Sequence, residues 1–119
     1  MPGAGRQRFA RRNRLCKKAD FTRAFETGTR RIGRRVLLYV VQNGLPYSRM
    51  GCSVSRRFGQ ATVRNRVKRV FREAFRTGLE ELPTGLDIVI IPRGRAREIA
   101  LEAVRSEIAG LCRGGEGPG

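Results

Sequence analysis

The sequence contains no histidine and no tryptophan, and its only aspartates are Asp20 and Asp87. Metal-free cleavage of RNA usually needs a histidine acid–base pair, and a two-metal nuclease needs several clustered carboxylates. Six of the eight glutamates lie after residue 79, so the spacing of the acids does not favour either arrangement. The composition therefore indicates a protein without a catalytic site of its own.

The sequence contains only three cysteines, Cys16, Cys52 and Cys112, and they lie far apart. Without histidine they form no zinc-binding motif, and we expect Cys52 and Cys112 to be buried or inert thiols. No apolar run reaches the length of about 18 residues that a membrane helix needs, and the basic N-terminus lacks the apolar segment of a signal peptide. We expect a cytoplasmic protein with no membrane partner.

Acidic residues are few, since 10 Asp and Glu face 26 Lys and Arg and leave a net charge of +16. The excess is uneven: residues 1–35 carry a net charge of +10, residues 49–76 carry +8, and residues 77–119 carry −2. A charge that served only solubility would be spread more evenly. The distribution therefore predicts a binding surface for a polyanion, by default nucleic acid.

The length of 119 residues suits one domain. Residues 1–14 are predicted to be a basic flexible arm, residues 15–112 a single RNA-binding α/β domain, and residues 113–119 a flexible tail. Phe21, Ala24 and Phe25 share one face of a predicted first helix. Further periodicity predicts strands over 34–42 and 47–54, joined by a short loop around Asn43-Gly44, then a helix over 61–77, a strand over 86–91 and a helix over 95–111.

This α-β-β-α-β-α order predicts a two-layer α-β sandwich with a small central sheet. The general rule for βαβ units predicts a right-handed crossover between the last two strands. In the strand over 47–54, Met50 alternates with Gly51, so we expect Met50 to pack inward and Gly51 to face outward.

The stretch ATVRNRVKRVFREAFR at residues 61–76 holds six basic residues and one acid. On a helical wheel one arc is apolar and reads as a core face, comprising Val63, Val67, Val70, Phe71, Ala74 and Phe75. The opposite arc is basic, with Asn65, Arg66, Lys68, Arg69, Arg72 and Arg76, while Arg64 falls at the edge of the apolar arc. A face of one sign repels itself, so it favours a polyanionic partner. Its Arg and Lys side chains suit phosphates, and RNA bound through its backbone fits better than sequence-specific DNA.

Arg64-Asn65-Arg66, followed by Val67-Lys68-Arg69, resembles the signature of the bacterial ribonuclease P protein family. Four further blocks are similar to this family in the expected order: RNRLCKKADFTRAFETGTR at 12–30, VLLYV at 36–40, GCSVSRRFGQATVRNRVKR at 51–69 and LDIVIIPR at 86–93. The resemblance covers residues 12–112. It implies an α-β-β-β-α-β-α-like fold whose βαβ crossover is left-handed, in place of the right-handed crossover expected from chirality alone.

The resemblance also implies a function. Proteins of this family bind a catalytic RNA that removes the 5′ leader from precursor tRNA, and Mg²⁺ acts through that RNA, so no cofactor is expected on the protein. The residues implied to bind the catalytic RNA are Arg64, Asn65, Arg66, Lys68, Arg69, Arg72 and Arg76. The residues implied to bind the leader of precursor tRNA are Phe21, Phe25, Tyr39, Lys17, Lys18, Arg56 and Arg57.

Several alternatives stay open from the residues themselves. The chain could be a ribosomal or RNA-assembly protein with no role in cleavage, or a stand-alone nuclease. Phe21, Phe25 and Tyr39 could all be core residues, which is the commoner role of two phenylalanines four positions apart. Asp20 could help to place a magnesium ion, or it could be a helix N-cap.

Overall fold

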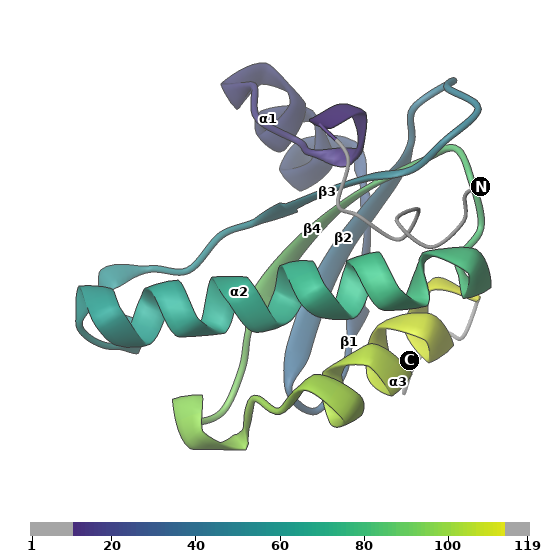
Figure 1. Ribbon diagram of the computed structural model, residues 1–119. Coiled ribbons are helices and arrows are strands. Elements are labelled where there is room, and N and C mark those ends of the chain that lie inside the picture. Colours follow the sequence, from purple (N-terminus) through teal and green to yellow (C-terminus); the bar gives the residue numbers. More distant parts are fainter. Residues whose placement is uncertain (1–10, 114–119) are drawn as a thin grey trace.

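The computed structural model describes residues 11–113, which form an α-β sandwich with a small central sheet, as predicted (Figure 1). The helices and strands of this part are α1 (Lys18–Thr27), β1 (Thr29–Ile32), β2 (Val36–Gln42), β3 (Arg49–Cys52), α2 (Ala61–Gly78), β4 (Leu86–Pro92) and α3 (Leu101–Cys112). Residues 1–10 of the predicted arm and residues 114–119 of the predicted tail lie outside the described residues.

β1 is a strand that the periodicity did not predict, although the family resemblance implied three strands before the long helix. Its sequence TRRI contains only one apolar residue, so it has no alternating pattern to detect. It pairs with β2 in antiparallel register, from Thr29 opposite Val40 to Ile32 opposite Leu37. Pairing to a buried neighbour, rather than intrinsic preference, therefore makes this segment a strand.

The strands lie in the order β1-β2-β4-β3. β2 and β3 follow each other in the chain, yet β4 lies between them, antiparallel to β2 and parallel to β3. The short loop after Gln42 therefore does not close a hairpin. It carries the chain past the position that β4 later fills.

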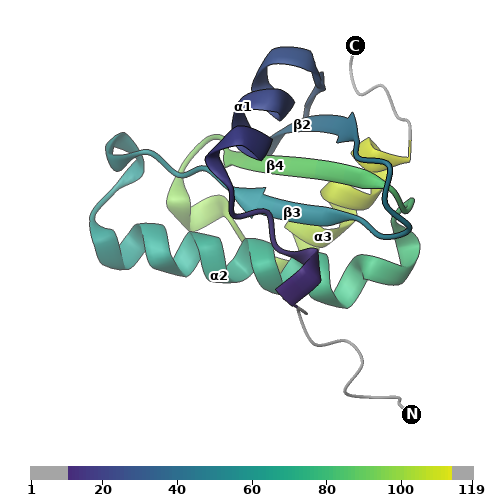
Figure 2. The same cartoon turned by 90° about the horizontal axis from the view of Figure 1, so that it is seen from above.

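α2 connects the parallel strands β3 and β4 along the face of the sheet that α3 also covers, while α1 covers the opposite face (Figure 1). The connection from β3 through α2 to β4 is a left-handed crossover (Figure 2). The apolar row of β2 and β4 gives a physical reason, because Val36, Leu38, Val40, Ile88 and Ile90 all belong to the core on the α2 side. A right-handed path would place the apolar stripe of α2 on the face that carries the charged residue Asp87.

The apolar arc of α2 is a core face, as predicted. Val67, Phe71, Ala74 and Phe75 are buried, and the helix runs over Ala61–Gly78 against the predicted 61–77. The last helix differs from its prediction, because α3 begins at Leu101 rather than at residue 95. A short turn over Ala96–Glu98 precedes it, in which the Glu98 carboxylate accepts the backbone N–H of Arg95 at 3.3 Å.

The prediction that Gly51 faces outward is wrong, because Gly51 is buried. An added Cβ at this position would lie 2.5 Å from Cζ of Phe21, so the absence of a side chain lets α1 approach β3. The segment before α1 lies here too. The side-chain amide of Asn13 donates to the carbonyl of Ser48 at 2.8 Å, and the N–H of Leu15 donates to the carbonyl of Met50 at 3.0 Å. Residues 11–14, predicted to belong to the arm, therefore pack on the domain.

Candidate RNA-binding site

An open groove of about 460 Å³ lies between α1 and α2, beside β3. Its lining comes from three segments that are distant in the sequence: Arg14, Leu15, Cys16 and Phe21, then Met50, Gly51 and Cys52, then Lys68 and Arg72. An aromatic ring and three basic side chains therefore share one hollow. A positive groove with an aromatic platform is the arrangement that holds single-stranded nucleic acid.

The three predicted leader-binding aromatic residues are partly exposed, and Phe21 and Tyr39 also pack against the small buried cluster on the α1 face. Phe21 is half-buried and lines the groove. Phe25 is 41% exposed, and its ring packs edge-on against Tyr39 with the centroids 5.0 Å apart. Ala24 is the fully buried residue of α1. The structure thus brings Phe25 and Tyr39 together as a second aromatic surface, on the same helix as Phe21.

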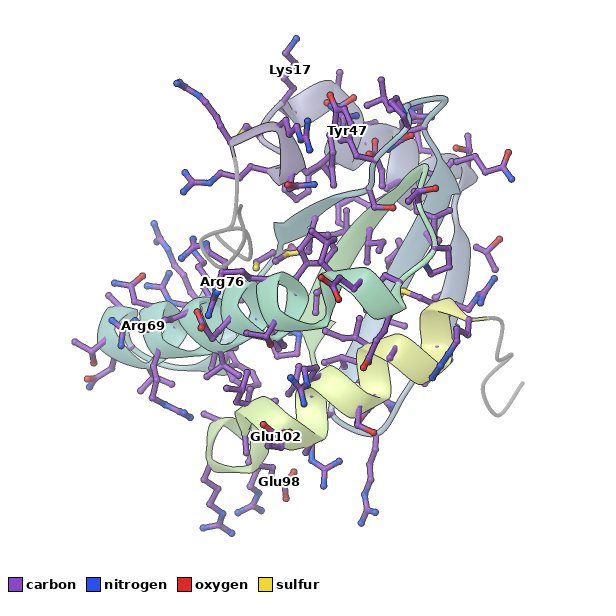
Figure 3. All side chains as sticks on the ribbon, turned by 45° about the vertical axis from the view of Figure 1, so that its right-hand side comes forward. Lys17, Tyr47, Arg69, Arg76, Glu98 and Glu102 are labelled. Carbon is purple, nitrogen blue, oxygen red and sulfur yellow. The ribbon has the colours of Figure 1, made fainter. Side chains whose placement is uncertain are left out.

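The four basic residues predicted beside these aromatics are exposed. Lys17 and Lys18 lie at the start of α1, and Lys17 projects into solvent (Figure 3). Arg56 and Arg57 lie in a short turn that leads from β3 toward α2. Within the described chain none of the four lines the groove itself.

The basic arc of α2 is less uniform than the wheel suggested. Asn65, Arg66, Arg69 and Arg72 are exposed, whereas Lys68 and Arg76 are half-buried. Arg76 forms an ion pair with Glu73, and the hydrogen bond from Arg76 lowers the pKa of the Glu73 carboxyl. Arg69 and Arg76 both project from α2 in Figure 3.

Arg66 of this arc, and Arg64 at its edge, each donate a guanidinium N–H to a backbone carbonyl. The Nε of Arg64 donates to the carbonyl of Gly59 at 3.1 Å, which holds the turn before α2. Arg66 donates from Nη2 to the carbonyl of Ala96 at 2.6 Å, across to the turn before α3. Lys68 and Arg72 differ again, because they line the groove with Phe21. The surface predicted for the catalytic RNA therefore meets the surface predicted for the leader.

A buried charge network, which the sequence did not reveal, attaches α1 to the sheet. Asp87 in β4 is fully buried. Its carboxylate accepts two hydrogen bonds from Arg49, at 2.8 and 2.7 Å, one from Arg23 at 2.9 Å and one from Asn43 at 2.9 Å. Burial by itself raises the pKa of Asp87, but the hydrogen bonds from Arg49 and Asn43 and the charges of Arg49 and Arg23 lower it overall. Asp87 is therefore a buried carboxylate anion.

Asp20 and Arg23 lie one turn apart on α1 and complete this network. Asp20 is 3.6 Å from Arg49, and Arg23 donates to Asp87 and to the carbonyl of Gln42. Asp20 makes no side-chain cap, because Lys17 is the N-cap residue of α1. The signal in the sequence was an aspartate in an otherwise apolar strand, LDIVII, opposite an arginine in β3. Strand pairing could not be known from the sequence, so the partners could not be found.

Known proteins match this chain over nearly all of the described part. The family model Ribonuclease P matches residues 9–114. A curated ribonuclease P protein component from Thermotoga petrophila is 39% identical over 113 residues, which is 92% of this chain and 97% of the relative. The chain belongs to the ribonuclease P protein family.

Solved structures of this family agree with the fold. The ribonuclease P protein from Thermotoga maritima superimposes with a TM-score of 0.76 at 36% identity, covering 84% of this chain and 94% of that one. The protein from Staphylococcus aureus superimposes with a TM-score of 0.73 at 28% identity, covering 85% and 93%. As a member of the family, the chain is the RNA-binding subunit of ribonuclease P, an endoribonuclease of tRNA 5′ maturation whose catalysis is carried by RNA. The ribosomal alternative is not favoured.

Two of the cysteines, Cys16 and Cys52, line the groove of this ribonuclease P protein, while Cys112 is buried at the end of α3. Burial raises the pKa of both Cys52 and Cys112 to about 11, against the nearby charges of Arg72 and Lys68 for Cys52 and of Arg31 for Cys112. This agrees with the prediction of inert thiols. Within residues 11–113 there is no group of three His, Cys, Asp or Glu that could hold a metal ion, and no helix there is long and apolar enough to cross a membrane.

Proposed function

We propose that this ribonuclease P protein binds two RNAs through adjoining surfaces. The catalytic RNA lies along the exposed face of α2, and the 5′ leader of precursor tRNA lies against α1 and in the groove beside Phe21. The groove is the observation that carries this proposal, because it brings one aromatic ring and three basic side chains together from three separate segments.

The leader surface follows from what unpaired nucleotides need. Exposed bases stack on aromatic rings, at about 1–3 kcal/mol per base, while basic side chains neutralise the backbone. Phe21 supplies a ring in the groove, and the packed pair of Phe25 and Tyr39 supplies a second aromatic surface. Lys17 and Lys18 at the start of α1 and Arg56 and Arg57 after β3 are the exposed cations proposed to contact the leader phosphates.

The catalytic-RNA surface follows from the charge of α2. Structured RNA presents phosphates and 2′-hydroxyls over a wide area, which suits a rigid row of cationic side chains. The cations Arg66, Arg69 and Arg76, together with Arg64 at the edge, form this row, and the neutral amide of Asn65 lies among them. Lys68 and Arg72 lie where the two surfaces meet, so we assign them to both RNAs.

Hydrolysis of the phosphodiester is assigned to the RNA partner with its own Mg²⁺. The protein contributes binding: it holds the leader beside the catalytic RNA and neutralises phosphates that would otherwise repel one another. We assign this removal of the 5′ leader to the cytoplasm, where bacterial precursor tRNA is made.

Reconstitution tests the proposal. The protein is added to its catalytic RNA and a precursor tRNA at low magnesium, and leader removal is measured. We expect the protein to accelerate leader removal strongly, and mature tRNA to bind more weakly than precursor tRNA. No acceleration would contradict the proposal, and cleavage by the protein alone would revive the nuclease alternative.

A further inference from the structure

The segment between β4 and α3 carries three arginines, although the last third of the chain is acidic as a whole. Arg93, Arg95 and Arg97 are all exposed. Within residues 11–113 none of them forms an ion pair with a carboxylate. Glu98, the acid beside them in the sequence, accepts the backbone N–H of Arg95. In the described part of the chain, the exposed guanidinium groups of Arg95 and Arg97 therefore keep their charge without a carboxylate partner.

The backbone of this segment is held in place on one side by the turn between β1 and β2. The N–H of Arg93 donates to the carbonyl of Arg35 at 2.8 Å, and Nη1 of Arg93 donates to the carbonyl of Gly33 at 2.6 Å. Within the segment, the N–H of Glu98 donates to the carbonyl of Arg95 at 2.8 Å. Arg95 and Arg97 are thus carried on an ordered turn rather than on a free loop.

On the other side the segment is held by α2. Arg66 donates from Nη2 to the carbonyl of Ala96, midway between Arg95 and Arg97, at 2.6 Å. This bond joins residues thirty positions apart, and it places the turn beside the N-terminal half of α2 (Figure 1). The cationic row of α2 therefore continues onto Arg95 and Arg97.

We propose that the turn at Arg95–Arg97 is a further RNA-binding surface, which contacts phosphates of the same catalytic RNA that lies along α2, and that Arg66 is the positioning residue that holds it there. This inference rests on the proposed function. Exposed guanidinium groups bind phosphate oxygens through paired N–H donors. Because the turn is already ordered, little conformational entropy is lost when RNA binds.

The first test measures the affinity of the full-length protein for its catalytic RNA at several salt concentrations. The double variant Arg95→Ala with Arg97→Ala is expected to bind about tenfold more weakly near physiological salt, and to lower the slope of log K against log salt by about 1–2. The matched control is Arg105→Ala with Arg113→Ala, which removes the same charge from α3 and its end. This control is expected to keep the wild-type slope.

The second test asks whether Arg66 acts through the turn. Arg66→Ala is introduced into the wild-type protein and into the Arg95/Arg97 double variant. If Arg66 positions the turn, its loss of affinity is expected to be several-fold smaller in the double variant, because the groups it positions are already gone. Equal losses in both backgrounds would overturn the positioning role.

The outcomes separate this inference from the proposed function. If the wild-type protein binds the catalytic RNA but the Arg95/Arg97 variant keeps the wild-type slope, the further surface is wrong and the proposed function stands. An equal loss of slope in the Arg105/Arg113 control would also overturn the surface, because the effect would then reflect net charge. If the wild-type protein fails to bind the catalytic RNA at all, the proposed function itself fails.

Discussion

The two faces of the sheet are held together by different forces. Between the sheet and the pair α2 and α3 lies a cluster of seventeen buried residues, including Phe71 and Phe75. Among the described residues, the buried cluster between the sheet and α1 has three members, Leu15, Ala24 and Val89. The network around the ionised Asp87 also attaches α1 to the sheet. Apolar burial scales with area, so the first face carries most of the stability of the fold.

This difference matters for function, because the weakly packed face is the one proposed to hold the leader. A buried ion network adds little net stability, but breaking it leaves uncompensated charges, so it enforces one geometry. The position of α1, and with it of Phe21 and Phe25, depends on Asp87, Arg49 and Arg23. The α2 face makes the domain fold, while the α1 face sets the shape of a binding surface.

The largest expected effect is on the α2 face. Phe71→Ala removes a fully buried ring and is expected to lower the free energy of unfolding by about 3–5 kcal/mol. Denaturant unfolding measures it. Phe25→Ala is the matched control, since the same truncation on the α1 face removes a ring that is 41% exposed and should cost about 1.5 kcal/mol or less. Equal losses would mean that the two faces do not differ as described.

A smaller effect is expected from Asp87→Asn, which leaves Arg49 and Arg23 without their shared carboxylate. Since both arginines are partly exposed, we expect a loss of about 3 kcal/mol or less. The specific result is a reduced preference for precursor over mature tRNA, measured as a ratio of dissociation constants, with affinity for the catalytic RNA kept.

The matched control for Asp87→Asn is Glu107→Gln, the same carboxylate-to-amide change on the other face. Glu107 accepts the backbone N–H of Arg35 and Val36, at 2.7 and 3.1 Å. Its loss is expected to lower stability without changing the ratio of precursor to mature binding. If both variants changed the ratio equally, Asp87 would act through general stability alone.

Phe25→Ala also tests the α1 face through its effect on RNA binding. Loss of the ring that packs against Tyr39 is expected to weaken precursor tRNA binding by about 1–3 kcal/mol. Binding of mature tRNA, which lacks the leader, should change little. An equal effect on both RNAs would remove Phe25 from the leader surface.

A finer comparison lies within α2 itself. Arg69→Ala should change only the binding of the catalytic RNA, and should lower the slope of log K against log salt for that RNA by about 1. Arg72→Ala, which changes a residue of the groove, should also weaken the binding of precursor tRNA. Titration of both RNAs measures the two variants, and identical profiles would show that the two surfaces are not divided as proposed.

The smallest expected effect is the change of folding stability with pH. The pKa of Asp87 is lowered in the folded protein, so its contribution to stability is present above its unfolded pKa of about 3.9. That contribution is lost as the pH falls through the lower folded value. Denaturant unfolding between pH 5 and pH 3 should show a steeper acid loss for the wild type than for Asp87→Asn. Parallel curves would contradict the assignment.

The sequence predicted those features that depend on local pattern or on charge. The apolar stripe of α2 over Val67, Phe71 and Phe75 was visible at helical spacing, and so was the basic face opposite it. β1 was missed because TRRI has no pattern of its own, and the start of α3 was placed too early because residues 95–98, with the sequence RARE, are all compatible with a helix. The leader-binding role of Phe21, Phe25 and Tyr39 was implied only by the family resemblance, and the sequence did not place Lys68 and Arg72 beside Phe21.

The sequence by itself determined that α2 has one apolar face and that the positive charge is concentrated in the first 76 residues, because hydrophobic periodicity and charge are local properties that survive any arrangement of the elements. Only the tertiary structure decided that Asp87 meets Arg49 and Arg23, that Phe21 shares a groove with Lys68 and Arg72, and that Arg66 reaches Ala96. These contacts join distant segments. They depend on β4 entering the sheet between β2 and β3 and on the left-handed path of α2, which follow from how the apolar faces of all the elements are buried together.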